Sequence, residues 1–231
     1  WKQGFQPRGN SQFGRSSDAT SEVGVRSDGL AVTGANQGAQ SRTLTGSGPT
    51  SWRHDNTPFG IADLNGNVWE WSPGMRINNG EIHVIENNNA ALSTADFGAS
   101  SADWKAIDGA TGALVAPGTA GTVKYASANS GTADYTLYRA NGSSFEGMVN
   151  STGANPVSAA AIARLKALGL FPVAPSGLGG DGFYLNVSGE RLPFRGGYWL
   201  DAALSGVFAL NLYNARTLSD AGLGARPAFV L

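Results

Sequence analysis

The residues that could perform covalent or metal chemistry are few in this chain. None of the 231 residues is a cysteine, which excludes a disulfide, a thiolate zinc site and a thiol nucleophile. The two histidines, His54 and His83, are far apart in sequence and lack the short spacing of an iron-binding pair. Two histidines also give little support to a Ser-His-Asp arrangement, and a lone histidine such as His83 is typically a hydrogen-bonded or surface residue. The sequence therefore predicts that the chain is not an enzyme.

The acidic residues give no clear catalytic or metal site either. Glu81 and Glu86 belong to one expected hairpin, and Asp181 and Glu190 fall in expected loops, so no two acids are placed across a cleft as a glycosidase requires. Residues 63–67 and 86–89 are rich in the oxygen ligands that calcium prefers, but neither has the spacing of a dedicated calcium loop. Turn-capping asparagines are the favoured interpretation. We expect no cofactor and assign no residue to a structural calcium ion.

The C-terminal part of the chain offers a binding surface instead. Segments 194–199, 207–212 and 225–230 are short, apolar and predicted to be strands. Segments 200–205 and 213–223 follow neither the helical nor the strand period, and their leucines lie beside Asp, Ser and Gly. Apolar side chains in surface loops are the kind that partners cover, so these loops are candidate contact surfaces. The alternative is that they fold back onto the core.

Several elements are expected to support these loops. In residues 68–71 the order V-W-E-W places two tryptophans on one face of a strand. Residues 74–79 are predicted to turn the chain into a half-buried strand at 81–85, which makes a hairpin. The region 90–190 is interpreted as a long insertion. It is predicted to contain a short helical turn within 101–114 and short strands at 122–126 and 183–187.

Residues 155–169 predict the one clear helix. Asn155 can cap it, Pro156 suits its first position, and Gly169 ends it. Apolar side chains spaced by four, four and three residues predict a stripe that packs on the body. The stripe consists of Val157, Ala161, Leu165 and Leu168.

The N-terminal region and the overall composition limit which structures and partners are expected. Residues 1–57 are predicted to be ordered loop, because apolar residues recur at regular intervals. These residues are Trp1, Phe5, Phe13, Val23, Leu30 and Trp52. A net charge of −1 without a run of basic residues is unlike a nucleic-acid-binding chain, and no apolar run is long enough to span a membrane. The start at Trp1, without a methionine, is interpreted as an N-terminally truncated fragment.

Three motifs carry a resemblance to known proteins. The order of GIADLNGNVWEW (60–71), FRGGYW (194–199) and GARPAF (224–229) resembles the formylglycine-generating-enzyme branch of the C-type lectin fold. GVFALNLYNAR followed by TLSDAGLGARPAF resembles the variable region of proteins diversified by retroelements, which include receptor-binding proteins of temperate phages. The resemblance implies an α+β, loop-rich C-type lectin fold of the formylglycine-generating-enzyme-like subclass. It further implies one domain over residues 1–231, with an insertion at about 90–190 and a variable region at about 194–231.

The resemblance also implies which residues bind a ligand. In such families an adenine-directed copying error rewrites chosen asparagine codons, which cannot then become Lys, Glu, Gln, Trp or Met. None of these five residue types occurs from 200 to 226. The residues that stand where asparagine is expected are Leu200, Asp201, Tyr213, Thr217, Leu218, Asp220, Ala221 and Leu223. Further candidate positions are Tyr198, Ala203, Leu204, Ser205 and Ser219.

The types of these residues predict what each would contribute to binding. Tyr213 is the best single anchor, because tyrosine offers a large amphipathic surface with few rotors. Asp201 and Asp220 would select between charged partners.

Formylglycine-generating enzymes depend on cysteine, and the related iron-dependent sulfoxide synthases need clustered histidines. This chain has neither.

The predicted function is therefore receptor recognition through diversified side chains. The expected location is a phage tail or a cell surface, and the expected partner is a protein or glycan on a target cell. No nucleic acid and no direct membrane insertion are expected. Two alternatives stay open. One is a carbohydrate-binding module of fixed specificity, and the other is a structural virion or assembly protein whose apolar loops are buried between subunits.

Overall fold

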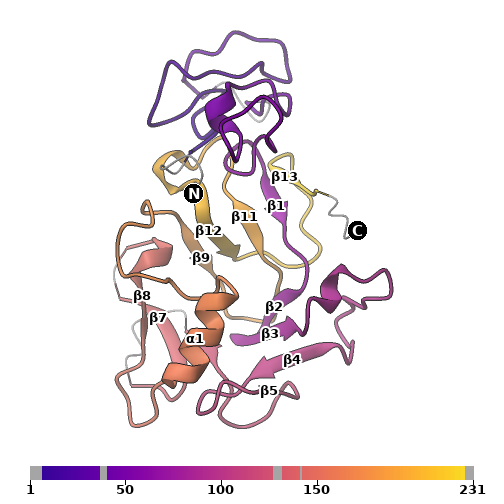
Figure 1. The fold of residues 1–231 in the computed structure, drawn as a ribbon, viewed down its shortest axis with the longest axis vertical. Coiled ribbons are helices and arrows are strands. Elements are labelled where there is room, and N and C mark those ends of the chain that lie inside the picture. The colour runs from indigo at the N-terminus through magenta and orange to yellow at the C-terminus, as the bar shows by residue number, and fades with distance from the viewer. Residues whose placement is uncertain (1–6, 37–40, 127–131, 141, 227–231) are drawn as a thin grey trace.

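Two β-sheets and one α-helix make up most of the regular structure in the described part of the chain. The computed structural model describes residues 7–36, 41–126, 132–140 and 142–226 (Figure 1). Strands predominate and a single α-helix, α1 (Ala159–Ala167), occurs within these ranges, which confirms the broad α+β class. Short 3-10 helices lie in the connections, namely η1 (Thr50–Trp52), η2 (Asn89–Ala91), η3 (Phe145–Gly147) and η4 (Ala202–Leu204).

The smaller sheet joins the central tryptophan strand to the C-terminal strands. Its five strands lie in the order β13, β1, β11, β12, β9. Their bounds are β13 (Leu223–Gly224), β1 (Trp69–Trp71), β11 (Phe194–Gly196), β12 (Gly206–Leu212) and β9 (Phe183–Leu185). The predicted strands 194–199 and 207–212 are thus confirmed in part. The first is shorter because the register shifts at Gly196, where φ is +90° and an added Cβ would lie 2.6 Å from the Leu64 carbonyl oxygen. The predicted strand 225–230 is wrong at its described residues, because β13 ends at Gly224, and 227–230 lie outside the described residues.

The larger sheet is built mainly from the middle of the chain. Its order is β10, β2, β3, β6, β7, β8, with β4 paired to β3 and β5 paired to β4. The bounds are β2 (Met75–Asn78), β3 (Glu81–Ile85), β4 (Trp104–Ile107), β5 (Leu114–Val115), β6 (Lys124–Tyr125), β7 (Thr136–Arg139), β8 (Met148–Asn150) and β10 (Glu190–Arg191). Residues 90–190 therefore supply six strands, β4 to β9, and all of α1. They contribute strands to both sheets.

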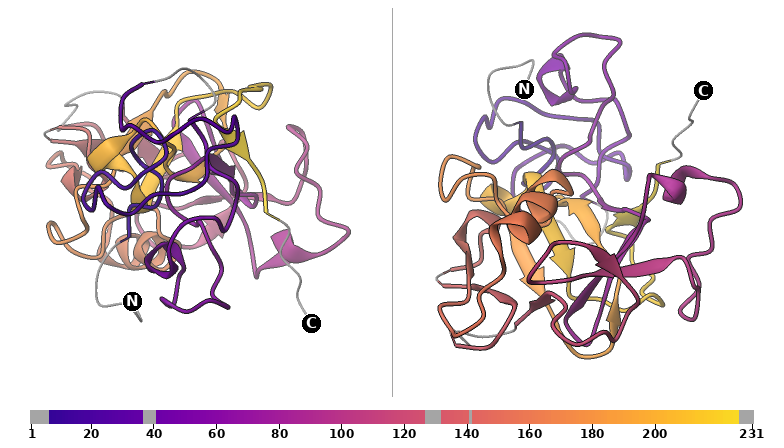
Figure 2. Two further views of the ribbon diagram at one scale, coloured as in Figure 1. Left: turned by 90° about the horizontal axis from the view of Figure 1, so that it is seen from above. Right: turned by 60° about the horizontal axis from the view of Figure 1, so that its bottom comes forward.

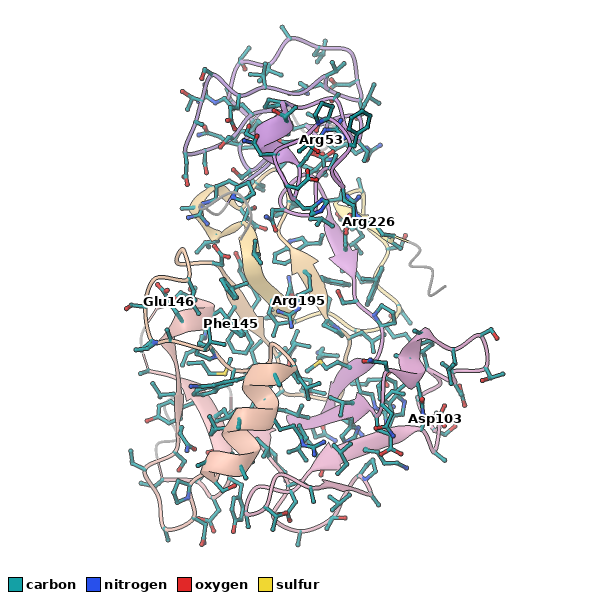
Figure 3. The ribbon with its side chains drawn as sticks, in the orientation of Figure 1. Arg53, Asp103, Phe145, Glu146, Arg195 and Arg226 are labelled. Carbon is teal, nitrogen blue, oxygen red and sulfur yellow. The ribbon has the colours of Figure 1, made fainter. Side chains whose placement is uncertain are left out.

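The main hydrophobic core lies between the two sheets and α1. One cluster joins Ile77 and Ile82 of the larger sheet to Leu165 of α1 and to Phe183 and Leu210 of the smaller sheet, all of them fully buried. Arg195 also points from β11 to this side, where its guanidinium donates to the Gly169 carbonyl oxygen at 2.9 Å just after α1 (Figure 3). The smaller sheet thus has one face closed by the rest of the molecule.

The hairpin prediction is correct in kind and wrong in its strands. Residues 75–78, expected to be part of the turn, form β2, which pairs with β3. The turn is confined to Asn79 and Gly80, whose φ angles of +48° and +82° suit a tight two-residue hairpin turn. All five residues of β3 are buried, although a half-buried strand was expected, because β3 pairs with β2, β4 and β6. Its polar side chains are satisfied, since His83 Nε2 lies 2.6 Å from Glu81 Oε2 and His83 Nδ1 accepts from Arg76 at 3.0 Å.

The predicted helix exists but begins later than expected. Ser158, rather than Asn155, caps it by accepting from the Ala161 N–H at 3.2 Å. Gly169, with φ +66°, ends it as predicted. The predicted stripe is confirmed at its first three positions, which are buried, and wrong at Leu168, which is 44% exposed. The helical turn expected within 101–114 is wrong, since β4 and β5 occupy that stretch and pair with each other.

The N-terminal region forms a layer of irregular chain over one end of the smaller sheet (Figures 1 and 2). In the described part of residues 1–57 only η1 is a regular element, which confirms the ordered-loop prediction. The predicted apolar anchors are only partly right. Trp52 is buried and Phe13 half-buried, but Val23 and Leu30 are exposed, and Trp1 and Phe5 lie outside the described residues.

Buried polar side chains hold this layer where apolar anchors were expected. The Asn67 side chain accepts from the Thr43 N–H at 2.7 Å and donates to the Thr43 carbonyl at 3.0 Å. Asn65 donates to the Pro7 carbonyl at 2.9 Å. The turn-capping interpretation of residues 63–67 is therefore wrong for these two asparagines, because their side chains bond distant segments of the chain and not their own turn. Of the helices in the described ranges, none has the length and apolarity needed to span a lipid bilayer.

Candidate functional site

The candidate site lies on the face of the smaller sheet that points away from the main core. Cross-strand neighbours Trp71, Phe194, Asn211 and Tyr184 form a row across four strands. Because successive side chains of a strand point to opposite faces, this row shares one face, while Phe183, Leu210 and Leu212 point to the other. The tryptophan prediction is confirmed, since Trp69 and Trp71 both belong to the cluster on the outer face.

Aromatic rings form the floor of this face. Trp69 packs edge-to-face on Tyr184, with ring centroids 5.8 Å apart at 88°, and lies 6.5 Å from Tyr198. Trp71 packs edge-to-face on Phe194 at 4.1 Å. Paired rings of this geometry bury large surfaces and have few accessible rotamers. The floor is therefore a rigid support for the loops that cross it.

A pocket of about 330 Å³ opens between this floor and the two C-terminal loops. The strands contribute its aromatic and amide walls, and residues 198–201 and 214–223 contribute its rim. Its lining residues are Trp69, Tyr184, Phe194, Tyr198, Asp201, Asn211, Asn214, Leu218, Asp220, Gly222 and Leu223. A concave site with aromatic walls and a few polar groups is the usual form of a small ligand site.

Asp201 is the strongly perturbed carboxylate of the pocket. Its two carboxylate oxygens accept from the Tyr198 N–H at 3.0 Å and from the Tyr184 hydroxyl at 3.3 Å. Burial raises the pKa of Asp201 to about 6, although these two hydrogen bonds act in the opposite direction. Burial, followed by the Asp201 charge, also raises the pKa of Tyr184. Asp201 is thus a half-buried carboxylate whose ionised form is poorly compensated.

Asp220 lies on the opposite rim and shapes the loop that carries it. Its carboxylate accepts from the Gly222 N–H at 2.7 Å, which closes a short turn before β13. Burial, then the charges of Asp201 and Asp220, raise the pKa of Tyr198. Two carboxylates from separate loops therefore act on the same hydroxyl, and the pocket has a negative potential.

The structure brings together five of the thirteen residues predicted to bind a ligand. Tyr198, Asp201, Leu218, Asp220 and Leu223 line the pocket. Six more are exposed, namely Leu200, Ala203, Tyr213, Thr217, Ser219 and Ala221. Leu204 is half-buried. The segment 200–205 contains no strand, as predicted, whereas the segment 213–223 is free of strand only up to its last residue, Leu223, where β13 begins.

Ser205 differs from the other predicted binding residues because it is fully buried. Its hydroxyl donates to the Tyr198 carbonyl at 3.2 Å, and its own carbonyl accepts from the Arg8 guanidinium at 2.6 Å. Arg8 also pairs with the buried Asp181 at 2.7 Å. Ser205 therefore holds the loop in place and presents no side chain to a ligand.

Sequence reasoning did not single out several pocket residues. Tyr184, Asn211 and Asn214 were not proposed, and Phe194 was noted only as part of a strand. The alternation within residues 183–187 could have placed Tyr184 opposite the apolar Phe183 and Leu185. No signal in the sequence indicated that β9 would be adjacent to β12 in the sheet.

Within the described ranges, no group of three or more His, Asp or Glu side chains is arranged to hold a metal ion. A structural calcium ion stays an unassigned prediction. No protein-family model matches this sequence, and a search of curated proteins finds no match.

Proposed function

We propose that this chain is a receptor-recognition protein that binds its ligand through diversified surface side chains, without catalysis and without a resident cofactor. The proposal includes a C-type lectin fold of the formylglycine-generating-enzyme-like subclass. It treats residues 1–231 as one domain, with an insertion at about 90–190 and a variable region at about 194–231. The accessible loops above the aromatic floor support the binding part of this proposal.

One observation carries the proposal. Five candidate side chains from two separate loops line one pocket, and six others are exposed. A set of core residues would be buried throughout, but only Ser205 among the thirteen is fully buried. Gathering on an accessible pocket is expected for residues selected for contact.

The packing beneath the loops explains how such residues could vary. Trp69 and Phe194 hold the floor, and the opposite face of the same sheet is closed by the main core. Changes at exposed loop positions such as Tyr213 and Thr217 leave that packing untouched. A rigid support also lowers the entropic cost of binding.

The partner we propose is a protein or glycan on a target cell, met by a chain on a phage tail or a cell surface. Exposed Leu200 and Tyr213, 47% and 56% accessible, could make apolar contacts with either class. Nucleic acid is not proposed, because the net charge is −1 and basic residues do not cluster in the sequence.

Sequencing the surrounding DNA tests the diversification directly. We expect a near-copy of the segment encoding 194–231 next to a reverse transcriptase gene, with adenines in the copy wherever the two differ. Differences should fall on the codons of the thirteen candidate residues. A locus without such a copy, or with differences spread over codons for Trp199 and Leu210, would contradict the proposal.

A double variant tests the binding role. Replacing Tyr213 and Leu218 with alanine should abolish adhesion to a responsive strain from a panel of candidate host cells, while the free energy of unfolding falls by only about 1 to 1.5 kcal/mol. The matched control replaces Phe59 and Leu44, which are 96% and 54% exposed in the N-terminal layer, and should keep adhesion. Equal adhesion by both double variants would exclude these loops as the contact surface.

A fixed-specificity carbohydrate-binding module is the second candidate. The pocket supports it because tyrosine and tryptophan rings lie beside Asp201 and Asn211, a combination that can stack on a sugar and bond its hydroxyls. In that case genes from the same locus in related strains would keep identical residues at the thirteen positions. The comparison of loop codons therefore separates the two candidates.

A further inference from the structure

The charged residues that line the pocket are all acidic. Among its eleven lining residues two are aspartates and none is lysine, arginine or histidine. Some half-buried or buried acids elsewhere in the described chain have basic partners, since Glu190 pairs with Arg76 and Arg216, and Asp181 pairs with Arg8, whereas Asp63 and Glu146 form no ion pair. Within that same part of the chain, neither Asp201 nor Asp220 takes part in an ion pair. The pocket lining therefore has two aspartates without an ion-pair partner in the described chain. The Arg42 guanidinium lies nearby, but it donates to the Ala221 carbonyl oxygen, at 3.2 Å.

Keeping Asp201 in this position costs folding free energy. Its carboxylate is half-buried beneath the loop and has hydrogen bonds from one N–H and one hydroxyl, which leave further lone pairs open. The raised pKa reports the same penalty for the ionised form. A cation in the pocket would offset this penalty by direct attraction in a partly dehydrated setting.

The aromatic walls favour the same kind of ligand. The rings of Trp69, Tyr184 and Tyr198 line the same pocket as the two carboxylates. Cations bind the faces of tryptophan and tyrosine rings, and cages that combine such rings with acids recognise ammonium groups. A cavity of about 330 Å³ is at the small end of ligand sites, which suits a single side chain or a small molecule.

The residues beside the pocket favour a side chain on a macromolecule over a free amine. Leu200 adjoins Asp201 in the chain, and Tyr213 adjoins Asn214, and both present exposed apolar surface. A small amine in the pocket would leave that surface uncovered, whereas a protein surface would bury it around the cation. Arginine is enriched among the few residues that dominate binding in protein interfaces, where surrounding contacts exclude water from the anchor.

We propose that the pocket binds the cationic side chain of a lysine or arginine on a protein partner. This inference rests on the proposed function and names the ligand chemistry of the same site. The sheet supplies the aromatic floor, and Asp201 and Asp220, two of the candidate diversified positions, supply the selectivity for positive charge. A copy of the gene with neutral residues at these two positions would not select a cation.

Calorimetric titration of the folded chain with small blocked probes tests the inference. Acetyl-lysine amide and acetyl-arginine amide should bind, and acetyl-norleucine amide, the neutral analogue of lysine, should bind at least about tenfold more weakly. A peptide with lysine between two leucines should bind more tightly than acetyl-lysine amide, and ethylammonium should bind more weakly. Added salt should weaken lysine and arginine binding.

Asp201→Asn provides the site-specific test. This variant should weaken the binding of acetyl-lysine amide by about tenfold, which corresponds to about 1.4 kcal/mol. Asp103→Asn is the matched control, because it changes the net charge equally and lies outside the pocket, beside β4 (Figure 3). It should leave binding unchanged. Circular dichroism and thermal melting verify that both variants fold.

Three results would overturn the inference. They are equal binding of the norleucine and lysine probes, unchanged lysine binding by Asp201→Asn, and binding of methyl galactoside or acetylglucosamine without binding of either basic probe. Ethylammonium binding as tight as the peptide would assign the pocket to free amines. If these tests fail while the DNA near-copy is present, receptor recognition stands and only the cationic ligand class is wrong.

Discussion

The two faces of the smaller sheet show how one element can serve stability and binding at once. On the inner face Phe183, Leu210 and Leu212 are fully buried against α1 and the larger sheet. On the outer face the aromatic floor is covered only by irregular loops, which leave a pocket with two carboxylates. The strands are the same, so the difference lies in what covers each face. The inner cover is regular secondary structure, whereas the outer cover is chain without periodicity.

This comparison indicates where mutations should matter for folding. The inner face buries apolar side chains, together with Arg195, which donates to a carbonyl beside α1. The outer face keeps Asp201 in a position that raises its pKa. Residues that lower stability while lining a pocket are typical of functional sites.

The largest effect is expected from a cavity on the inner face. Leu210→Ala should lower the free energy of unfolding by about 2 to 5 kcal/mol, because Leu210 is fully buried and its neighbours cannot collapse into the space. The same change at Leu218, which is half-buried on the outer face, should cost about 1 kcal/mol. Urea denaturation measures both. Equal losses at the two positions would remove the distinction between the faces.

A change at Asp201 is expected to raise the free energy of unfolding, by an amount smaller than the loss at Leu210. Its folded-state pKa of about 6 lies above the value of an unfolded aspartate, about 3.8. The stabilising contribution of its protonated form is therefore complete below about pH 4 and is lost as pH rises through 6. Asp201→Asn mimics the protonated form and should raise stability by about 1 to 3 kcal/mol at pH 7.

The pH dependence of this variant sharpens the test. The gain from Asp201→Asn should disappear below about pH 4, where the carboxyl is protonated in both states. Asp220→Asn, at an exposed position of the same pocket, should change stability little at either pH. Thermal melting across this pH range gives both curves. A loss of stability in Asp201→Asn at pH 7 would mean that the carboxylate is a structural group.

The smallest effect is expected at the exposed rim. Tyr213 is 56% exposed, and Tyr213→Ala should change the free energy of unfolding by about 0.5 kcal/mol or less. The tyrosine Tyr125, buried in the main core with its hydroxyl donating to the Leu170 carbonyl, is the contrasting position. Tyr125→Ala should be strongly destabilising. A large drop in melting temperature for Tyr213→Ala would place that residue in the folded core.

The elements that sequence reasoning found share a simple local signal. Alternating apolar residues marked β1, β3 and β12, and Gly169 marked the end of α1. Errors arose where partners far along the chain decided the outcome. Residues 104–107 became β4 because β3 offers an edge for pairing, and the N-terminal layer is held by Asn67 and other buried polar groups where apolar anchors were expected.

The candidate site was predicted in part for the same reason. The unpatterned leucines and aspartates of 200–205 and 213–223 identified the loops as separate from the core. They could not show which side chains meet. Tyr184 and Asp201 are 17 positions apart and come together because β9 pairs with β12. The burial of Ser205 depends on Arg8, which is 197 positions away.

The amino-acid sequence by itself determined strands β1, β3 and β12, the end of α1, the absence of cysteine chemistry and the position of the irregular C-terminal loops. Periodicity and turn residues act over a few positions, so they can be read locally. Only the tertiary structure decided that these loops cross an aromatic floor, that two aspartates from separate loops share one pocket, and that this pocket lacks a basic residue. Strand order and loop packing depend on contacts between segments that are distant in the sequence. A local sequence pattern does not specify such contacts.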